Sequence, residues 1–262
     1  MTRIYRIDYR GTPRHAIEAD GRWRLLEGDL FDGYEAGSDI DPPMQLRAPV
    51  VPSKIVAIGL NYKDHAAEQH KSLPQEPMMF IKPSTAVIGP GETIVMPDGA
   101  GRIDYEAEVG VVIGRRASHV AAADAHEYVL GLTCVNDVTA RELQVKDVQY
   151  TRAKGFDTFA PLGPCIAVGL DYRAAEGVGV EGWVNGERRQ ASSTKQLIFS
   201  IDTLVAFVSR VMTLLPGDVI STGTPAGIGP LKGGDRVTVK VDGVGELSNP
   251  VGQGITQRGA RS

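Results

Sequence analysis

The sequence predicts a predominantly β protein of the α+β class, built as a mixed β-sheet roll or sandwich with a small β-rich module at its N-terminus. Three observations favour this fold class. Many short segments rich in valine and isoleucine are bounded by glycine, proline or aspartate, as strands commonly are. These segments do not alternate regularly with helical ones, which argues against a doubly wound sheet. The 31 glycines and 16 prolines suit the many turns that such a fold needs.

Residues 1–50 form the N-terminal module of this prediction, and residues 51–262 form the main domain. The segments 4–11 and 21–28 have the composition of short strands around turns. Four prolines then fall within eleven residues, and proline resists both helices and central strands. Residues 41–53 are therefore predicted to be a linker.

In the main domain the strand pattern recurs along the chain, with a few helices between the strands. The expected strands include residues 54–60, 78–82, 105–114, 128–137, 163–169, 218–223 and 236–241. The expected helices are residues 62–70, 121–128, 138–148 and 201–214. Asn185-Gly186 and Asp242-Gly243 are dipeptides typical of hairpin turns.

Composition excludes several classes of function. The chain of 262 residues is 42% hydrophobic and 23% charged, with a formal net charge of −4, as in ordinary soluble globular proteins. Like charges do not cluster, so no nucleic-acid partner is expected. No apolar run approaches the ~18 residues that cross a bilayer, and no signal peptide is evident, so we expect a cytoplasmic protein without a membrane partner. Cys134 and Cys165 are expected to be buried and reduced.

Three acidic residues are the first candidates for chemistry. Glu106 and Glu108 precede an apolar run, and side chains two residues apart on a strand share a face. Neighbouring carboxylates repel each other unless a cation or proton lies between them. Asp137 follows another apolar strand, and three carboxylates leave about half of an octahedral Mg²⁺ or Mn²⁺ shell open. Spacing alone leaves an alternative, in which two solvated glutamates lie at a sheet rim and Asp137 caps a helix.

A histidine and a glutamate are the second candidates. The expected helix at 62–70 places His65 and Glu68 three residues apart on one face. The carboxylate can hold the tautomer of the imidazole and raise its basicity, so the pair can deprotonate a water molecule near neutral pH. The alternative is an exposed helix with an incidental contact.

Further polar residues lie later in the chain. Arg141 and Gln144 share a helical face one turn after Asp137, where Arg141 either binds an anionic substrate or pairs with Glu142 or Asp147.

Two later segments carry no known catalytic motif. Residues 151–159 are predicted to be a loop, in which Lys154 either stabilises a developing enolate or is an ordinary solvated lysine. The hydroxyls and backbone N–H groups of residues 221–227 could cradle a carboxylate. The sequence has no G-x-S-x-G motif, no dinucleotide fingerprint and no plausible Ser–His–Asp set.

Together, five blocks resemble the fumarylacetoacetate hydrolase family, in the family's order and over residues 54–250. They are G-x-N-Y-x-x-H-x-x-E at 59–68, D-Y-E-A-E-x-x-V-V-I-G at 104–114, N-D-V-T-A-R-x-x-Q at 136–144, T-R-A-K-G-F-D-T-F-x-P-x-G-P at 151–164 and T-G-T-P-x-G at 222–227. Five blocks in order are highly specific, and they outweigh the alternatives given above for each motif.

The resemblance implies a mixed β-roll, usually a homodimer, that binds Mg²⁺ or Mn²⁺, with Ca²⁺ as a structural substitute. It also implies roles for individual residues. By position, the metal ligands are Glu106, Glu108 and Asp137, the catalytic residues are His65, Glu68 and Lys154, and the substrate-binding residues are Arg141, Gln144, Gly223 and Thr224.

The resemblance further implies a small 2-oxo acid as substrate. The animal fumarylacetoacetase has a fourth carboxylate ligand ahead of its catalytic histidine, whereas this chain offers only Asp64, next to His65. This departure favours the acylpyruvate-type branch, in which the C3–C4 bond of a substrate such as fumarylpyruvate is hydrolysed to pyruvate and a carboxylic acid. Isomerisation of 2-hydroxyhepta-2,4-diene-1,7-dioate and decarboxylation of oxaloacetate are the alternatives on the same site. A metal-binding scaffold without activity is the alternative from another class.

Overall fold

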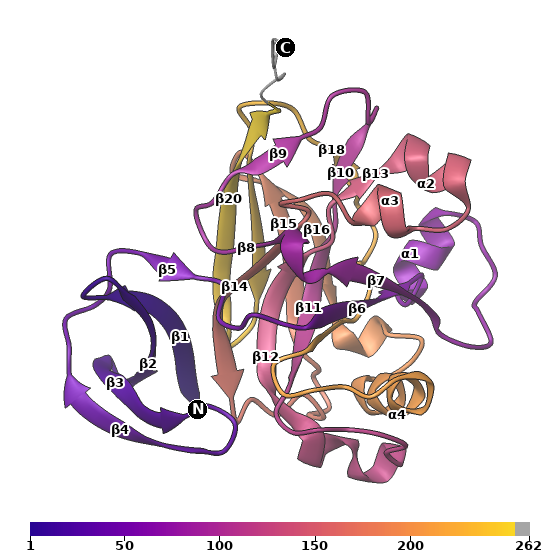
Figure 1. The fold of residues 1–262 in the computed structure, drawn as a ribbon. Coiled ribbons are helices and arrows are strands. Elements are labelled where there is room, and N and C mark those ends of the chain that lie inside the picture. The colour runs from indigo at the N-terminus through magenta and orange to yellow at the C-terminus, as the bar shows by residue number, and fades with distance from the viewer. Residues whose placement is uncertain (255–262) are drawn as a thin grey trace, which may run out of the picture.

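Two β-sheets packed against each other form the centre of the molecule, and most helices gather on the side away from the N-terminal strands (Figure 1). The structure, a computed structural model, describes residues 1–254. This architecture confirms the predicted fold class. In the described part of the chain, no helix has the length and hydropathy that crossing a bilayer requires.

The larger sheet has 12 strands and mixed direction. Its strands are β1 (Thr2–Tyr9), β2 (Thr12–Ala19), β3 (Arg22–Asp29), β4 (Gly33–Asp39), β5 (Leu46–Arg47), β6 (Lys54–Gly59), β7 (Met78–Pro83), β8 (Val87–Ile88), β11 (Ala107–Ile113), β12 (Val129–Asn136), β14 (Ala160–Val168) and β17 (Val219–Ser221). The order is β4-β3-β2-β1-β14-β12-β11-β17-β6-β7, with β5 pairing with β1 and β8 with β14.

Two smaller sheets complete the fold. The five-stranded sheet has the order β16-β15-β19-β20-β9, and the three-stranded sheet has the order β13-β10-β18. Their bounds are β9 (Ile94–Met96), β15 (Gly179–Val184), β16 (Glu187–Ser193), β19 (Arg236–Val241), β20 (Gly245–Gln253), β10 (Ile103–Tyr105), β13 (Thr139–Ala140) and β18 (Gly229–Pro230).

Helices are short and connect the strands. The α-helices are α1 (Lys63–Glu68), α2 (Arg141–Asp147), α3 (Thr151–Lys154) and α4 (Ile201–Val211), and the 3₁₀ helices are η1 (Ser84–Ala86), η2 (Ala122–Tyr128) and η3 (Thr194–Gln196). In Figure 1, α1, α2 and α3 lie close to one another, near the ends of β6 and β7.

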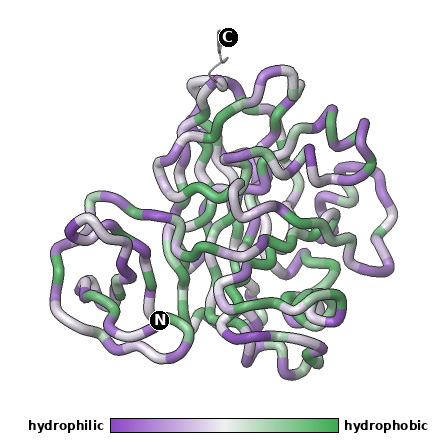
Figure 2. Tube along the Cα trace, viewed as in Figure 1, coloured by the Kyte–Doolittle hydropathy of each residue, from purple (hydrophilic) through white to green (hydrophobic). Residues whose placement is uncertain are grey.

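The main core lies between the 12-stranded and the five-stranded sheet. It is built from apolar side chains of β11, β12, β19 and β20, such as Val109, Leu132, Val239 and Leu247. Burying a side chain of this kind contributes about 1.5–3 kcal/mol. Figure 2 shows hydrophobic stretches along the central strands and hydrophilic stretches in the outer loops. Cys134 and Cys165 are buried in this core and are not disulfide-bonded, as predicted.

The N-terminal strands are continuous with the larger sheet. β1 pairs with β14 in antiparallel fashion, with Ile4 opposite Ile166. The proline-rich segment 41–53 lacks regular structure except at β5, a two-residue strand that pairs with β1. The domain boundary at residue 50 stays a prediction.

The structure corrects several predicted elements. The helix expected at 138–148 begins only at Arg141, because Thr139 and Ala140 pair with β10. Residues 151–159 were expected to be a loop, but they begin with the one-turn helix α3, whose Ala153 is buried. One turn is too short to be stable as an isolated helix, so burial of this side chain supports it.

Other predicted elements differ only at their ends or are present as expected. Residues 121–128 form a 3₁₀ helix in place of the expected helix, and the helix at 201–214 ends at Val211. Asn185-Gly186 joins β15 to β16 with positive φ at both residues, and Asp242-Gly243 lies between β19 and β20. Both hairpins are therefore confirmed.

One buried aspartate fixes the junction of β6 and β17, and we expect it to matter for stability. Asp218 is fully buried and accepts hydrogen bonds from Ser53 Oγ at 2.6 Å, Lys54 Nζ at 2.5 Å and Leu215 N at 2.8 Å. Asp218→Ala leaves these donors unpaired, so the free energy of unfolding should fall by about 3–5 kcal/mol in urea denaturation. The exposed Asp171→Ala is the matched control and should cost less than about 0.5 kcal/mol; an equal effect of the two changes would contradict this prediction.

Candidate active site

Three buried carboxylates lie where two strands end side by side. Glu106, Glu108 and Asp137 each offer an oxygen within 4.8 Å of the others. Glu106 stands between β10 and β11, where the chain passes from the three-stranded to the 12-stranded sheet, and Glu108 follows on β11. Asp137 follows the last residue of β12, and its N–H donates to Glu106 O at 2.9 Å. The pairing of β11 with β12 thus brings Asp137 to two glutamates that lie 29 and 31 positions before it.

The two glutamates have opposite electrostatic environments. Burial, together with the nearby Asp137 and Glu106, raises the pKa of Glu108 from 4.5 to about 8. Its Oε2 accepts hydrogen bonds from Ser221 Oγ at 2.5 Å and from Gly223 N at 2.9 Å. Burial would also raise the pKa of Glu106, but the Arg141 guanidinium and the Lys154 ammonium outweigh it and hold this pKa well below its usual range.

Two lysines bind Asp137, and only one of them was predicted. Lys154 Nζ donates to Asp137 Oδ2 at 2.6 Å and to Glu106 Oε2 at 2.7 Å. Lys82 Nζ, from β7, donates to Asp137 Oδ1 at 2.5 Å and to Val138 O at 3.2 Å. Both oxygens of Asp137 are therefore held by cations, and Asp137 does not cap α2, whose N-cap residue is Ala140.

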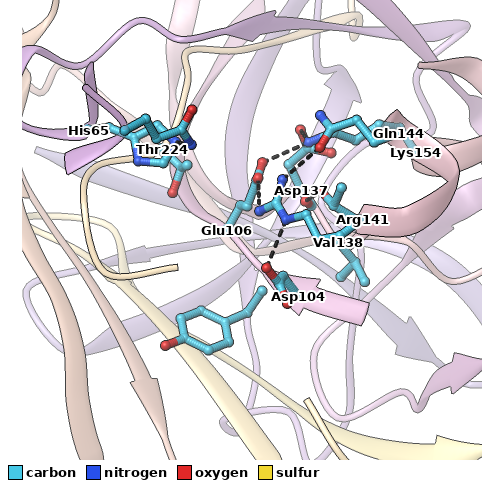
Figure 3. Close-up of polar contacts among 12 residues, drawn as sticks. His65, Asp104, Glu106, Asp137, Val138, Arg141, Gln144, Lys154 and Thr224 are labelled. Atoms are coloured by element: carbon cyan, nitrogen blue, oxygen red, sulfur yellow. Dashed lines mark hydrogen bonds and ion pairs between the residues drawn. The ribbon is translucent and has the colours of Figure 1, made fainter. Parts of the chain in front are cut away.

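Arg141 extends the charge network away from the carboxylate group. Its Nε donates to Asp104 Oδ2 at 2.7 Å, its Nη1 donates to Gln144 Oε1 at 3.0 Å, and its Nη2 is hydrogen-bonded to Glu106 (Figure 3). The sequence had offered Glu142 or Asp147 as ion-pair partners for Arg141, and the partners are instead Asp104 and Glu106. These two acids lie far from Arg141 in sequence, which is why local spacing could not find them.

The predicted histidine–glutamate contact is present on α1. His65 Nδ1 lies 2.9 Å from Glu68 Oε2, and Gly227 N donates to Glu68 Oε1 at 2.9 Å. His65 Nε2 lies 2.8 Å from the side-chain amide of Gln69, a residue that the motifs did not single out. Asp64 accepts from Ser192 Oγ at 2.6 Å and is not part of the carboxylate group.

A cavity of about 210 Å³ connects these features. The carboxylates line one part of it and His65 lines another. Eight of the ten predicted site residues line this cavity, namely His65, Glu106, Glu108, Asp137, Arg141, Gln144, Lys154 and Thr224. The other two, Glu68 and Gly223, are not among the lining residues, and each hydrogen-bonds one that is.

The segment after β17 is fixed by close packing. Gly223 has φ +102°, and a Cβ there would lie 2.8 Å from Asn61 Cβ, so only glycine fits. The Thr224 hydroxyl donates to Ala107 O at 2.9 Å and accepts from Gln190 Nε2 at 2.8 Å. Gln190 is fully buried on β16 and was not predicted, since no sequence motif surrounds it.

The donor set suits a hard divalent cation. Mg²⁺ and Mn²⁺ prefer carboxylate oxygens, and the three ligand candidates supply only these. Burial and the neighbouring acids raise the pKa of Glu108, and a bound cation would favour its ionised form. The residues present therefore fit such a metal.

A two-sheet roll in which a buried Glu–Glu–Asp group and a histidine line one cavity is an arrangement shared with enzymes of the hydrolase and isomerase type. Residues 54–252 match the fumarylacetoacetate (FAA) hydrolase C-terminal domain. The chain belongs to the fumarylacetoacetate hydrolase family.

Three relatives show the range of activities in this family. The chain is 43% identical to 5-carboxymethyl-2-hydroxymuconate delta-isomerase from Mycobacterium smegmatis, with a TM-score of 0.88 over 96% of this chain and 100% of that one. It is 29% identical to maleylpyruvate hydrolase from Sphingobium sp. SYK-6, with a TM-score of 0.80 and 96% and 100% coverage. It is 39% identical to the mitochondrial oxaloacetate tautomerase of Xenopus laevis, over 79% of this chain and 68% of the relative.

The raised pKa of Glu108 predicts an unusual pH dependence in chelator-treated protein. The folded state keeps a proton on Glu108 up to about pH 8, whereas the unfolded chain releases it near pH 4.5. The stabilisation is therefore fully present below pH 4.5 and is lost as the pH rises through about 8. Glu108→Gln cannot ionise but keeps an acceptor for Ser221 and Gly223. We expect its free energy of unfolding, measured in urea with EDTA, to fall less with rising pH than that of the wild type.

The same variant tests the metal site. Mn²⁺ at about 100 times its Kd should stabilise the wild type by about 2.7 kcal/mol, and Glu108→Gln by much less. The exposed Glu127→Gln controls for the loss of a carboxylate elsewhere. Identical behaviour of Glu108→Gln and the wild type in both experiments would show that Glu108 neither holds the extra proton nor binds the metal.

Proposed function

We propose that this chain is a divalent-metal-dependent hydrolase that cleaves an acylpyruvate-type 2,4-dioxo acid, such as fumarylpyruvate, to pyruvate and a carboxylic acid. The observation that supports it most is that the carboxylate group and His65, which contacts Glu68, line the same cavity. Hydrolysis needs both groups. A metal held by the carboxylates would stabilise the leaving enolate, and the histidine would activate the attacking water.

The residues would divide the reaction between them. Glu106, Glu108 and Asp137 would hold Mg²⁺ or Mn²⁺, which when bound supplies the positive charge that stabilises an enolate. Glu68 would accept the Nδ1–H of His65, so that Nε2, which lies 2.8 Å from the Gln69 amide, carries no proton and can act as a base.

The attack then follows from this tautomer. A water molecule that replaces the Gln69 amide at His65 Nε2 would lose a proton to that nitrogen as its oxygen adds to the acyl carbonyl carbon. The C3–C4 bond breaks, its electron pair goes to the pyruvate enolate, and a proton then converts this enolate to pyruvate. Lys154 would lie beside the negative charge that develops, because its Nζ already lies between Glu106 and Asp137.

A second candidate function is isomerisation or tautomerisation of a 2-oxo acid at the same site. The isomerase from M. smegmatis and the oxaloacetate tautomerase of X. laevis, to which this chain is 43% and 39% identical, favour it. In that reaction His65 would move a proton between two atoms of the substrate, and no water would attack. Decarboxylation of oxaloacetate, which also forms a pyruvate enolate, is a third reaction that the same site could support.

Parallel assays distinguish these reactions. Purified protein with Mg²⁺ or Mn²⁺ would be given acetylpyruvate, fumarylpyruvate, oxaloacetate and 2-hydroxyhepta-2,4-diene-1,7-dioate, with EDTA controls. We expect loss of the diketone absorbance with one pyruvate formed for each molecule consumed. Turnover confined to the diene diacid or to oxaloacetate would overturn the hydrolase proposal.

The role of His65 can be tested in the same assay. His65→Ala should lower the rate of hydrolysis by about 10²–10⁴-fold, because a general base is lost. His70→Ala is the matched control, since His70 is exposed at the end of the same helix and does not line the cavity. Equal rates for His65→Ala and the wild type would exclude His65 as the base.

We also propose a homodimer in which a second copy covers the edge strand β7. This strand has one partner, β6, in the described sheet, and an apolar hollow of about 410 Å³ runs along it, lined in part by Phe80, Ile81, Val148 and Met212. Ile81 is 39% exposed. A strand that is paired on one edge only, with exposed apolar side chains beside it, is a common site of association between chains.

Light scattering coupled to size exclusion tests this dimer. The wild type should have the mass of two chains, and Ile81→Asp should shift it towards one. Val95→Asp, on the edge strand β9 of the other sheet, is the control and should leave the mass unchanged. A wild-type mass of one chain would overturn the dimer proposal.

A further inference from the structure

Lys82 is a buried charge that the proposed reaction does not use. Its side chain is fully buried on β7, and it is not among the residues that line the cavity, so substrate does not reach it. Its Nζ lies 2.5 Å from Asp137 Oδ1 and 3.2 Å from Val138 O. Burial lowers the pKa of Lys82 while Asp137 opposes this shift, and two oxygen acceptors suit an ammonium donor.

Negative charges around the carboxylate group do not outnumber the positive charges, even without a metal. The acids are Glu106, Glu108, Asp137 and Asp104, and the bases are Lys82, Lys154, Arg141 and Arg102. At most four negative charges thus face four positive ones: Asp104, Glu106 and Asp137 pair with the bases, whereas Glu108 is hydrogen-bonded to Ser221 and Gly223. A divalent cation that enters this network adds two positive charges, and no further acidic group of the network is left to neutralise them. In a buried site this excess is costly, because screening by water is weak.

We propose that Lys82 is a fixed counter-charge that couples metal binding to the binding of an anionic substrate head. With Lys82 in place, Asp137 attracts the metal less strongly, so the metal alone binds weakly. A 2-oxo acid brings the negative charge that the metal-loaded site lacks, and the two ligands therefore bind cooperatively. By linkage, the metal strengthens binding of the anion by the same factor.

Lys82 is suited to this task in a way that the other bases are not. Lys154 and Arg141 line the cavity, so a substrate can draw them away from the carboxylates. Lys82 has no exposed surface and is held between Asp137 and Val138 on a strand of the larger sheet. Its charge therefore remains beside Asp137 whatever fills the cavity. It is a positioning residue, not a catalytic one.

Calorimetric titration of Mn²⁺ into the chelator-treated full chain, with and without saturating oxalate, tests the proposal. Oxalate carries two adjacent carboxylates, resembles the head of a 2-oxo acid and does not react. In the wild type, oxalate should lower the Kd of Mn²⁺ by at least about tenfold, within the usual range of coupling between sites. In Lys82→Met, Mn²⁺ alone should bind about tenfold more tightly and the effect of oxalate should shrink to about threefold or less.

Two further variants complete the design. Lys82→Gln is neutral but keeps an amide that can donate to Asp137 and Val138, so it guards against loss of folding in Lys82→Met and should show the same two changes. Lys240→Met also replaces a lysine by methionine, but in a partly exposed ion pair in which Lys240 Nζ lies 2.6 Å from Glu246. This control variant should behave as the wild type.

The outcomes separate this proposal from the proposed function on which it rests. If the wild type binds no Mn²⁺, the metal-dependent function fails. If the wild type binds Mn²⁺ but the neutral Lys82 variants bind it with unchanged or weaker affinity, or with the same response to oxalate, only the role of Lys82 is overturned. Failure of both neutral variants to fold would also overturn it, because Lys82 would then be structural.

Discussion

Close approach of three buried carboxylates is the constraint on which the rest of this site depends. Glu106, Glu108 and Asp137 cannot all be ionised in the dry interior unless positive charge or hydrogen bonds compensate them. Different parts of the fold supply this compensation. β7 provides one lysine, α3 provides another, and the segment after β17 provides hydrogen-bond donors to Glu108. These three elements therefore act together to hold the acids close to one another.

Hydrogen bonds of the loop between β17 and β18 also link the carboxylate group to His65. Glu68 accepts from both His65 and Gly227, so one carboxylate holds the imidazole and also ties α1 to the loop before β18. Thr224, a few residues earlier, is tied to Ala107 between the two glutamates. The loop thus connects the histidine to the acids through hydrogen bonds.

Local patterns in the sequence predicted local structure well. The two hairpins follow from Asn-Gly and Asp-Gly, and the contact of His65 with Glu68 follows from helical spacing. These features need only neighbours within a few residues. The five motif blocks went further and indicated the family, and with it the fold and the members of the carboxylate group.

Long-range pairing was beyond such reasoning. Lys82 reaches Asp137 across 55 positions, and Arg141 reaches Asp104 across 37, because strand order decides which side chains meet. One signal was available for Lys82, since it is the only charged residue in the apolar strand β7. Helix α3 was missed because a single turn is too short to show a helical pattern in the sequence, and burial of Ala153 supports it. The break between β10 and β11 at Glu106 was likewise not predicted, because it depends on the pairing of these strands in two different sheets.

The pairing of β1 with β14 has a consequence for how this chain avoids aggregation. β14 is buried along most of its length, and its outer edge is covered by β8 at Ala160 and Pro161 and by β1 from Ile166 to Val168. Without the N-terminal strands, an apolar strand with free backbone groups would face solvent and offer a template to other chains. The N-terminal meander therefore serves as a protective edge for the sheet that carries the site, whatever else it does.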